Sequence, residues 1–299
     1  MERLACIGIG SNAIRLLIAC REGERLCALR RERRGTRLFA GLVNGALTQE
    51  SIWASVEAVG ELAALARADG ARELFIFATS AVRDAANGGE FTRRAEEVSG
   101  ARVEIVTGEE EAVLSYLGAS EGGACGVIDI GGGSTEFTLG EGARILGAQS
   151  LQMGAVRMTA QLPILSEADY ALTRERCERI IRRDAQALLA MPPRAQWVGV
   201  GGTMTTLGAM QRGIPLFDAA TCEGMTITRG EVARWGAGLS RMAMEERRQV
   251  AGLMPHRADI IPSGVAILEA AMRCFGVETL RLSAHGNMDG YLKRRFGLA

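Results

Sequence analysis

Ile128-Asp129-Ile130-Gly131-Gly132-Gly133-Ser134-Thr135-Glu136 is the stretch of sequence from which the fold is most readily inferred. The apolar run from Cys125 to Ile130 predicts a buried strand, the three glycines predict a tight turn, and Thr135 to Leu139 predicts a second strand. Consecutive glycines can aim several backbone N–H groups at one point, an arrangement that binds phosphate oxygens. The candidate phosphate-binding residues of this loop are Gly131, Gly132, Gly133, Ser134 and Thr135.

Two carboxylates, Asp129 and Glu136, stand on either side of this loop. A plain hairpin turn would explain the glycines alone, but an acid at the end of a buried strand needs a partner or a metal ion. Because His256 and His285 are the only histidines, a metal here would be held by carboxylates and water, which favours Mg²⁺ or Mn²⁺. The flanking acids Asp129 and Glu136 therefore favour a loop that binds phosphate and a metal ion over a plain hairpin turn.

The phrase Ile128-Asp129-Ile130-Gly131 has an earlier counterpart, Ile7-Gly8-Ile9-Gly10, which indicates an internal duplication. The matching loop supplies Gly10, Ser11 and Asn12 as a second set of candidate phosphate-binding residues, although any tight hairpin could use such a sequence. Two similar α/β domains facing a cleft are expected, residues 1–121 and 122–299, with a hinge near residues 119–124. The repeat aligns Gly8 with Asp129.

Hydrophobic periodicity and turn residues extend this reading along the whole chain. Strands are expected at residues 3–9, 13–20, 25–33, 73–78, 102–106, 125–130, 135–139, 143–151, 197–200 and 279–283. Helices are expected at residues 48–68, 89–99, 112–117, 167–189, 229–251 and 260–275, with one more after Gly202 and another at the C-terminus. Thr107 and Glu110 have the spacing of a capping box at the start of the helix that contains residues 112–117.

The composition excludes several classes of protein. The chain has 299 residues, of which 47% are hydrophobic and 23% charged, values typical of a soluble globular protein with two domains. A formal net charge of zero argues against nucleic-acid or membrane partners. We found no signal peptide or membrane span and no Cys-x-x-Cys among the seven cysteines, so a cytoplasmic location with reduced thiols is expected. Lys293 is the only lysine, which excludes a Walker-type loop.

Three glutamates follow one another at Glu109, Glu110 and Glu111. Acidic residues are common in the first turn of a solvated helix, because the helix dipole favours them there. Glu110 is explained by the capping box with Thr107. One of the other two could deprotonate an attacking water, the role of a general base in a hydrolase that lacks suitable histidines. Spacing alone does not choose between Glu109 and Glu111.

Arginine and glycine supply further candidates. Arg83 follows a predicted strand and could clamp a phosphate, or it could pair with Asp84. Gly202 and Thr203, in a glycine-rich turn before a helix, are candidate phosphate-binding residues on a weaker pattern. Five further arginines lie close together in the sequence. We expect them at an exposed strand edge, where positive charge discourages aggregation, rather than on a surface that binds a polyanion. They are Arg30, Arg31, Arg33, Arg34 and Arg37.

Taken in order, these motifs resemble the exopolyphosphatase and guanosine pentaphosphate phosphatase (Ppx/GppA) family of the actin-like ATPase superfamily. The matching stretches are residues 9–16, 79–87, 107–112, 128–136, 153–157, 201–203 and 257–261. The resemblance implies two actin-like, ribonuclease H-like domains with mixed sheets flanked by helices, and an active site in the cleft between them. It also implies that a C-terminal helix near residues 288–299 packs back on the first domain.

The family's activity is the removal of terminal phosphate from polyphosphate or guanosine pentaphosphate with Mg²⁺. The resemblance assigns the general base to Glu111 and the metal-binding and phosphate-binding acids to Asp129 and Glu136. Either polyanion is therefore expected as the substrate. A homodimer is compatible with the sequence, which does not define the oligomeric state.

Two positions depart from the family pattern. Gly8 stands where an aspartate is usual, and Met288 replaces an arginine near the C-terminus. Both changes remove a polar group from the expected site, so a non-catalytic sensor that binds a phosphate-rich ligand is the main alternative function. An actin-like kinase that uses ATP is a further alternative, suggested by the shared fold and by the glycine-rich turn at Gly202.

Overall fold

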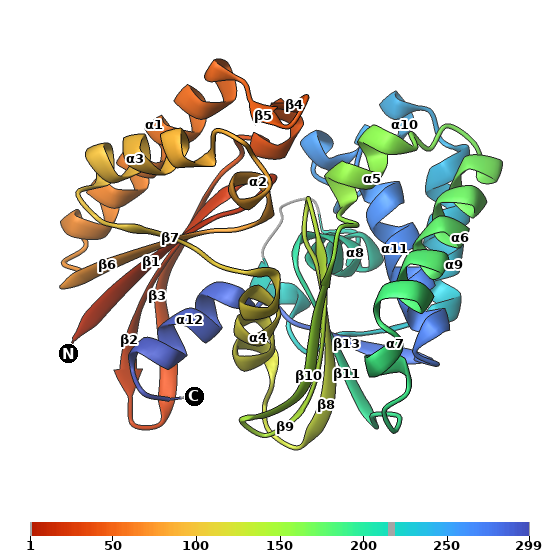
Figure 1. Cartoon of the computed structure of the whole chain (residues 1–299). Coiled ribbons are helices and arrows are strands. Elements are labelled where there is room, and N and C mark those ends of the chain that lie inside the picture. The colour runs from red at the N-terminus through yellow and green to blue at the C-terminus, as the bar shows by residue number, and fades with distance from the viewer. Residues whose placement is uncertain (1, 215–218, 299) are drawn as a thin grey trace. The chain divides into compact units, whose positions relative to one another are not determined.

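The computed structural model describes residues 2–214 and 219–298, and it divides the chain into two compact units (Figure 1). Unit 1 comprises residues 1–118 together with residues 287–299, and unit 2 comprises residues 119–286. Each unit is a mixed β-sheet packed with helices. The mixed α/β architecture expected from the sequence is therefore confirmed.

The sheet of unit 1 has the strand order β3-β2-β1-β6-β7. Its strands are β1 (Arg3–Ile9), β2 (Ile14–Glu22), β3 (Arg25–Arg34), β6 (Glu73–Ala78) and β7 (Val103–Ile105). The first three are antiparallel neighbours, whereas β6 pairs parallel with β1 and β7 pairs parallel with β6. In β1 every residue from Leu4 to Ile9 is hydrophobic or glycine and is buried, as expected for a central strand covered on both faces.

Helices cover both faces of this sheet (Figure 1). The long helix α1 (Gln49–Ala68) packs on β1, on β2 and on α3 (Gly88–Ser99). The C-terminal helix α12 (Asn287–Arg295) lies across β1, β2 and β3 on the opposite side. The remaining elements of unit 1 are α2 (Ser80–Arg83), α4 (Gly108–Ala119), the short strands β4 (Leu42–Val43) and β5 (Ala46–Leu47), and a 3-10 turn, η1 (Leu38–Gly41).

The C-terminal helix α12 is fixed in unit 1 by specific contacts. Its Tyr291 ring stacks on Phe77 with centroids 5.1 Å apart, and the Tyr291 hydroxyl donates to Glu104 Oε2 at 2.8 Å. Lys293 Nζ donates to Leu117 O at 2.8 Å, at the end of α4. A side chain at Gly290 would not fit, because its Cβ would lie 1.9 Å from Leu114 O. This close approach explains why residues 287–299 group with the N-terminal residues.

Unit 2 repeats the arrangement of unit 1 and extends it. Its sheet has the order β10-β9-β8-β11-β13-β12, in which β8, β9 and β10 are antiparallel neighbours and β11 pairs parallel with β8. The strands are β8 (Ala124–Ile130), β9 (Thr135–Glu141), β10 (Arg144–Leu151), β11 (Gln196–Val200), β12 (Thr226–Thr228) and β13 (Thr279–Leu282). The first four strands of the two sheets thus correspond one to one, as the repeated Ile-x-Ile-Gly phrase suggested.

The helices of unit 2 surround α11 (Ile261–Cys274), which is almost entirely buried and packs on four other helices. These four are α5 (Ala155–Gln161), α6 (Glu167–Asp184), α8 (Gly202–Arg212) and α9 (Arg229–Arg241). The shorter elements are α7 (Gln186–Leu189), α10 (Met244–Arg248) and the 3-10 turns η2 (Ala219–Cys222) and η3 (Pro255–Arg257).

Two predicted helices are shorter in the structure than in the sequence reading. The helix expected at residues 167–189 is interrupted at Ala185, whose φ and ψ of −113° and 25° lie outside the helical region. The helix expected at residues 229–251 ends at Arg241, because Met242 and Ala243 are extended. Neither interruption contains glycine or proline, so the sequence carried no signal for it.

All seven cysteines are free thiols, and burial is the main reason that the pKa of Cys6 is well above its usual value. A thiol of this kind is chemically inert. Within residues 2–214 and 219–298, no helix is both long enough and apolar enough to span a membrane.

Candidate active site

The first glycine loop closes the turn between β1 and β2 in unit 1. Gly10 N donates to Ala13 O at 3.2 Å, and the Ser11 hydroxyl lies 2.8 Å from that of Ser80, at the start of α2. Thr79 N donates to Ile9 O at 3.1 Å, which ties the segment after β6 to the end of β1. The loop therefore lies at the carboxyl ends of two parallel strands, the usual place for a ligand in an α/β sheet.

The side-chain amide of Asn12 is the clearest unsatisfied polar group of this loop. Its Nδ2 and Oδ1 atoms are both buried, and neither has a hydrogen-bond partner within the described residues. Buried side-chain amides are nearly always hydrogen-bonded, so an orphaned pair of atoms indicates a missing ligand or water. This supports the prediction that Asn12 faces a bound group.

Arg83 and Glu111 meet beside the first loop. Arg83 Nη1 donates to Val106 O at 2.9 Å and to Glu111 Oε2 at 3.4 Å. Its contact with Asp84, the alternative partner, is longer at 3.9 Å. Arg83 Nη2 is buried and has no hydrogen-bond partner in the described part of the chain. Arg83 thus both orients Glu111 and keeps a donor available for an anion.

Burial distinguishes the two glutamates that spacing left open. Glu111 is only 6% exposed, whereas Glu109 lies on the exposed side of α4. The capping box at the start of this helix is confirmed, because Thr107 N donates to Glu110 Oε2 at 2.7 Å and Glu110 N donates to Thr107 Oγ1 at 3.1 Å. Glu111 is therefore the only one of the three glutamates that lies inside unit 1 and next to Arg83.

Asp129 and Glu136 form a cross-strand pair in unit 2. They are direct neighbours in the β8–β9 register and are 7% and 1% exposed. Glu136 is in turn opposite Ser150 on β10, and the Ser150 hydroxyl donates to Glu136 Oε1 at 2.7 Å. Two adjacent buried carboxylates repel each other unless a cation or a proton lies between them. The pair is therefore suited to hold a cation.

The second glycine loop is held by the start of α5. Gly131 N donates to Ser134 O at 3.0 Å, and the carbonyl oxygens of Gly131 and Gly132 accept from Ala155 N and Val156 N, each at 2.9 Å. Arg157 Nε donates to Gly133 O at 2.6 Å. The start of α5 thereby fixes the loop through its carbonyl oxygens.

The two hydroxyl residues of this loop differ in their roles. Ser134 is buried at the turn, next to the glycines. The hydroxyl of Thr135 donates to the carbonyl of Met153, so its donor hydrogen serves the packing of unit 2. Of the two, Ser134 is the better candidate for a phosphate contact.

Gly201 and Gly202 bring a third loop next to Asp129. Gly201 has φ of +96°, and a Cβ there would lie 2.7 Å from Asp129 Oδ1, so only glycine is suited to this position. Gly202 and Thr203 follow at the N-terminus of α8, where backbone N–H groups favour anions. Sequence reasoning placed Gly202 and Thr203 in the site on a weak pattern, and the structure brings that loop beside the carboxylate pair.

Arg257 is a residue of the site to which sequence reasoning assigned no role. It is buried, and a Cβ at Gly202 would lie 2.2 Å from Arg257 Nη2. A guanidinium against a glycine at a helix N-terminus can contact a phosphoryl group directly. The sequence contained one signal, since Arg257 begins a stretch that resembles the family, but no local pattern separates it from the other arginines.

The residues of unit 2 fit a magnesium ion that keeps most of its water. Within the described ranges, no group of three or more His, Cys, Asp or Glu side chains could hold a metal ion. Mg²⁺ is commonly bound through one or two carboxylates, several waters and the phosphates of the substrate. The pair Asp129 and Glu136 matches that requirement, and Mn²⁺ accepts the same oxygen ligands.

Gly8 and Met288, the two departures from the family pattern, contact each other. A Cβ at Gly8 would lie 3.2 Å from Met288 Cγ and 3.3 Å from Met288 Sδ. Met288 is buried in the core cluster of unit 1. The thioether thus occupies the space that a side chain at Gly8 would enter, so unit 1 has no counterpart of Asp129.

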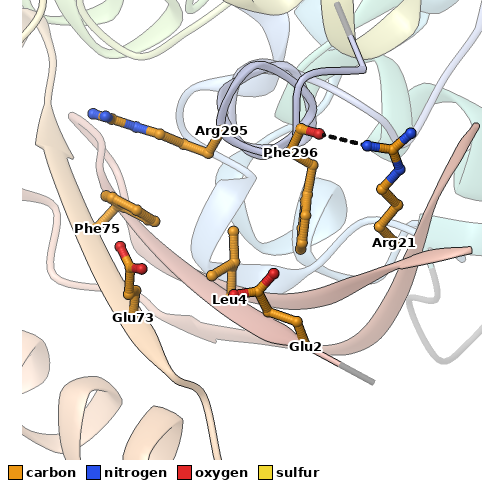
Figure 2. A pocket seen from close by; sticks show the side chains of 7 residues that line it. All are labelled: Glu2, Leu4, Arg21, Glu73, Phe75, Arg295 and Phe296. Carbon is orange, nitrogen blue, oxygen red and sulfur yellow. Dashed lines mark hydrogen bonds between the residues drawn. The ribbon is translucent and has the colours of Figure 1, made fainter.

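One hollow of unit 1 lies away from these loops. A cavity of about 240 Å³ is lined by Glu2, Leu4, Arg21, Glu73, Phe75, Arg295 and Phe296 (Figure 2). It is near the first residues of β1 and β6, whereas the glycine loop follows the last residue of β1. Two of the lining residues are hydrogen-bonded, since Arg21 Nη1 donates to Phe296 O at 3.1 Å (Figure 2).

A substitution at Gly154 tests how strictly the second loop must be positioned. A Cβ at Gly154 would lie 2.3 Å from the carbonyl carbon of Gly132, so Gly154→Ala must displace the loop or α5. We expect kcat to fall about 100-fold, because a displacement of about 1 Å in an active site has that effect. Gly89→Ala is the control, since its Cβ meets nothing within 4 Å. Equal phosphate-release activity of the two variants would contradict this role.

Two units of matching topology, each with a glycine loop between its first two strands, define a duplicated α/β protein of the actin-like class. The chain belongs to the Ppx/GppA phosphatase family, whose model matches residues 17–296. This confirms the family assignment made from the sequence motifs.

Individual relatives agree with the family assignment over the whole length of the chain. Exopolyphosphatase 2 of Mycobacterium tuberculosis is 34% identical over 317 aligned positions, which cover 97% of each chain. The Ppx/GppA enzyme of Aquifex aeolicus superposes with a TM-score of 0.82 at 28% identity, covering 97% of this chain and 98% of that one. An exopolyphosphatase from Cytophaga hutchinsonii has a TM-score of 0.89 at 22% identity, with 100% and 99% coverage, and supports the fold alone.

Proposed function

We propose that this protein is a metal-assisted exophosphatase that hydrolyses the terminal phosphate of inorganic polyphosphate, of guanosine pentaphosphate, or of both. The observation that carries the proposal is the buried pair Asp129 and Glu136 next to a glycine loop. Membership of a phosphatase family supports the reaction class. The name of the mycobacterial relative supports polyphosphate, and the name of the family supports the nucleotide.

In the proposed reaction, Glu111 is the general base. In unit 1, Glu111 accepts a proton from the attacking water, and Arg83 holds the Glu111 carboxylate in place. The water oxygen forms a bond to the terminal phosphorus, and the bond from phosphorus to the bridging anhydride oxygen breaks. The products are inorganic phosphate and a phosphate chain shorter by one unit.

The pair Asp129 and Glu136 is the proposed source of metal binding. A divalent ion held by Asp129 and Glu136, Mg²⁺ or Mn²⁺, would neutralise charge on the phosphoryl oxygens. The N–H groups of Gly132 and Gly133 and the guanidinium of Arg257 stabilise the same oxygens. These donors are fixed in place by α5 and by Gly202, so little reorganisation accompanies the reaction.

A non-catalytic sensor is the second candidate function, and the contact between Gly8 and Met288 favours it. The space in which unit 1 could carry a carboxylate is filled by a thioether. A protein of this kind would bind the same polyanions without turning them over.

Phosphate release separates the two candidates. The wild-type chain is incubated with polyphosphate or guanosine pentaphosphate and with Mg²⁺ or Mn²⁺, and free phosphate is measured, with Glu111→Gln as the control. We expect release that depends on the metal and is lost in the control. Tight binding of either polyanion by calorimetry with no release would establish the sensor, and the absence of both binding and release would refute both functions.

A further inference from the structure

The C-terminal helix α12 contacts both segments of unit 1 that carry candidate site residues. Its Met288 lies against Gly8, near the end of β1 and just before the first glycine loop. Its Gly290 lies directly on the backbone of α4, where any side chain would clash with Leu114 O. α12 therefore connects the strand that leads into the glycine loop to the helix that carries Glu111.

A positive charge on α12 holds the last carbonyl groups of α4. Lys293 Nζ donates to Leu117 O at 2.8 Å and to Gly118 O at 3.1 Å. Carbonyl groups in the last turn of a helix have no partner within the helix, and the helix dipole favours a cation beside them. Lys293 thus fixes α4 at the end that is farther from Glu111.

The sheet of unit 1 holds α12 at several points, so α12 can serve as a fixed support. The Tyr291 ring stacks on Phe77 with centroids 5.1 Å apart. Asp289, which is 2% exposed, forms an ion pair with Arg31 of β3. Leu292 is fully buried in the core cluster of unit 1. Close-packed contacts of this kind are poorly compressible and transmit displacements.

The other end of α4 meets Arg83 through a contact that tolerates little displacement. Arg83 Nη1 donates to Glu111 Oε2 at 3.4 Å, near the longest distance at which a hydrogen bond forms. Glu111 N donates to Thr107 O at 3.0 Å, so the residue is part of the helical hydrogen-bond pattern and moves with α4. Leu117 lies about 9 Å farther along the helix axis, at about 1.5 Å per residue. A shift of α4 at Leu117 therefore reaches Glu111.

We propose that Lys293 is a positioning residue for Glu111: its ammonium group fixes the C-terminal end of α4, and α4 holds the Glu111 carboxylate within hydrogen-bonding distance of Arg83. The role of Glu111 as a general base is taken from the proposed function, on which this proposal rests. Lys293 acts through Glu111 alone. Because a base stabilises the transition state and not the bound substrate, a change at Lys293 lowers kcat and leaves KM nearly unchanged.

Steady-state kinetics of two Lys293 variants test this role. Lys293→Met keeps most of the aliphatic side chain and removes the charge. We expect its kcat for phosphate release to fall about 10- to 100-fold with little change in KM, since a displacement of about 1 Å at a catalytic group costs up to about 100-fold. Lys293→Arg keeps a charged donor for the two carbonyl groups and should retain most of kcat. The control, Arg182→Met, removes an exposed charge from the last turn of α6 and should leave kcat unaltered.

A double-mutant cycle separates positioning from a general loss of structure. In Glu111→Gln there is no base to position, so adding Lys293→Met should leave the residual kcat unchanged. Equal losses of kcat in both backgrounds would overturn the proposal, and so would an unaltered kcat in Lys293→Met itself. The melting temperature of each variant establishes that it is folded under the conditions of the assay.

Amide hydrogen exchange supplies a readout that requires no turnover. Lys293→Met should speed the exchange of the amides of residues 112–118 about 10-fold or more, because two hydrogen bonds from a charged group are lost. Arg182→Met should leave these amides unchanged. Unaltered exchange in Lys293→Met would overturn the proposal even if the chain releases phosphate. Faster exchange in a chain that releases no phosphate would support the hold of Lys293 on α4 and refute only the proposed reaction.

Discussion

Replacing Glu111 with glutamine is expected to lower kcat for phosphate release about 10²- to 10⁴-fold, the range typical of a lost general base. The amide cannot accept a proton from water, but it has nearly the same shape. Its oxygen can still accept the hydrogen bond from Arg83 Nη1, which spans 3.4 Å to Glu111 Oε2. KM should therefore change little, and steady-state kinetics with polyphosphate measure both constants.

Glu109→Gln is the matched control for this experiment. It makes the same chemical change in the same helical turn, but on the exposed side of α4. Its kcat should equal that of the unaltered chain. If both variants lost activity equally, the first turn of α4 would act through its charge as a whole, and the role of Glu111 as a base would be wrong.

Replacing Asp129 with asparagine is expected to have the second large effect. The change halves the formal charge of the carboxylate pair and removes a strong ligand for a divalent ion. Metal assistance is worth several kcal/mol, and 1.36 kcal/mol corresponds to a factor of ten, so we expect activity to fall about 10²- to 10³-fold at a fixed metal concentration. The loss should be partly reversed at high Mn²⁺ or Mg²⁺ concentration.

Two measurements check the effect at Asp129 independently of turnover. Titration with Mn²⁺ should show weaker binding for Asp129→Asn than for Glu141→Gln, which makes a comparable change at the exposed end of β9. Without metal, Asp129→Asn should be at least as stable to urea as the unaltered chain, because the repulsion between two buried carboxylates is relieved. A variant with unaltered metal binding and strongly reduced stability would show that Asp129 has only a structural role.

Regular elements were predictable where a single period of hydrophobicity determines burial. The strands β1 and β8 begin and end close to their expected limits, because continuous apolar runs that end at glycine have few alternative structures. The division of the expected helix 229–251 into α9 and α10 was not predictable. There Met242 and Ala243 are extended, and neither residue has a local preference for a break in a helix.

The candidate site was predictable in its glycine loops and acids but not in its arginines. Glycine and carboxylate have few roles at the end of a buried strand, so their presence in Asp129 to Glu136 restricts the chemistry. An arginine side chain is long and can pair with any acid that the fold brings near. Arg31 pairs with Asp289, far away in the sequence, whereas Arg33 on the same strand has no carboxylate partner among the described residues.

The sequence by itself determined the duplicated α/β plan, the two glycine loops and the acids beside them, because backbone freedom and burial patterns are local properties. The family resemblance chose Glu111 over Glu109, and Glu111 is also the more buried of the two. Only the tertiary structure brought Arg257 to Gly202 and paired Gly8 with Met288. Each of these depends on a contact between segments distant in the chain. The free energy of such a contact comes from packing and charge in three dimensions, and no spacing along the sequence encodes it.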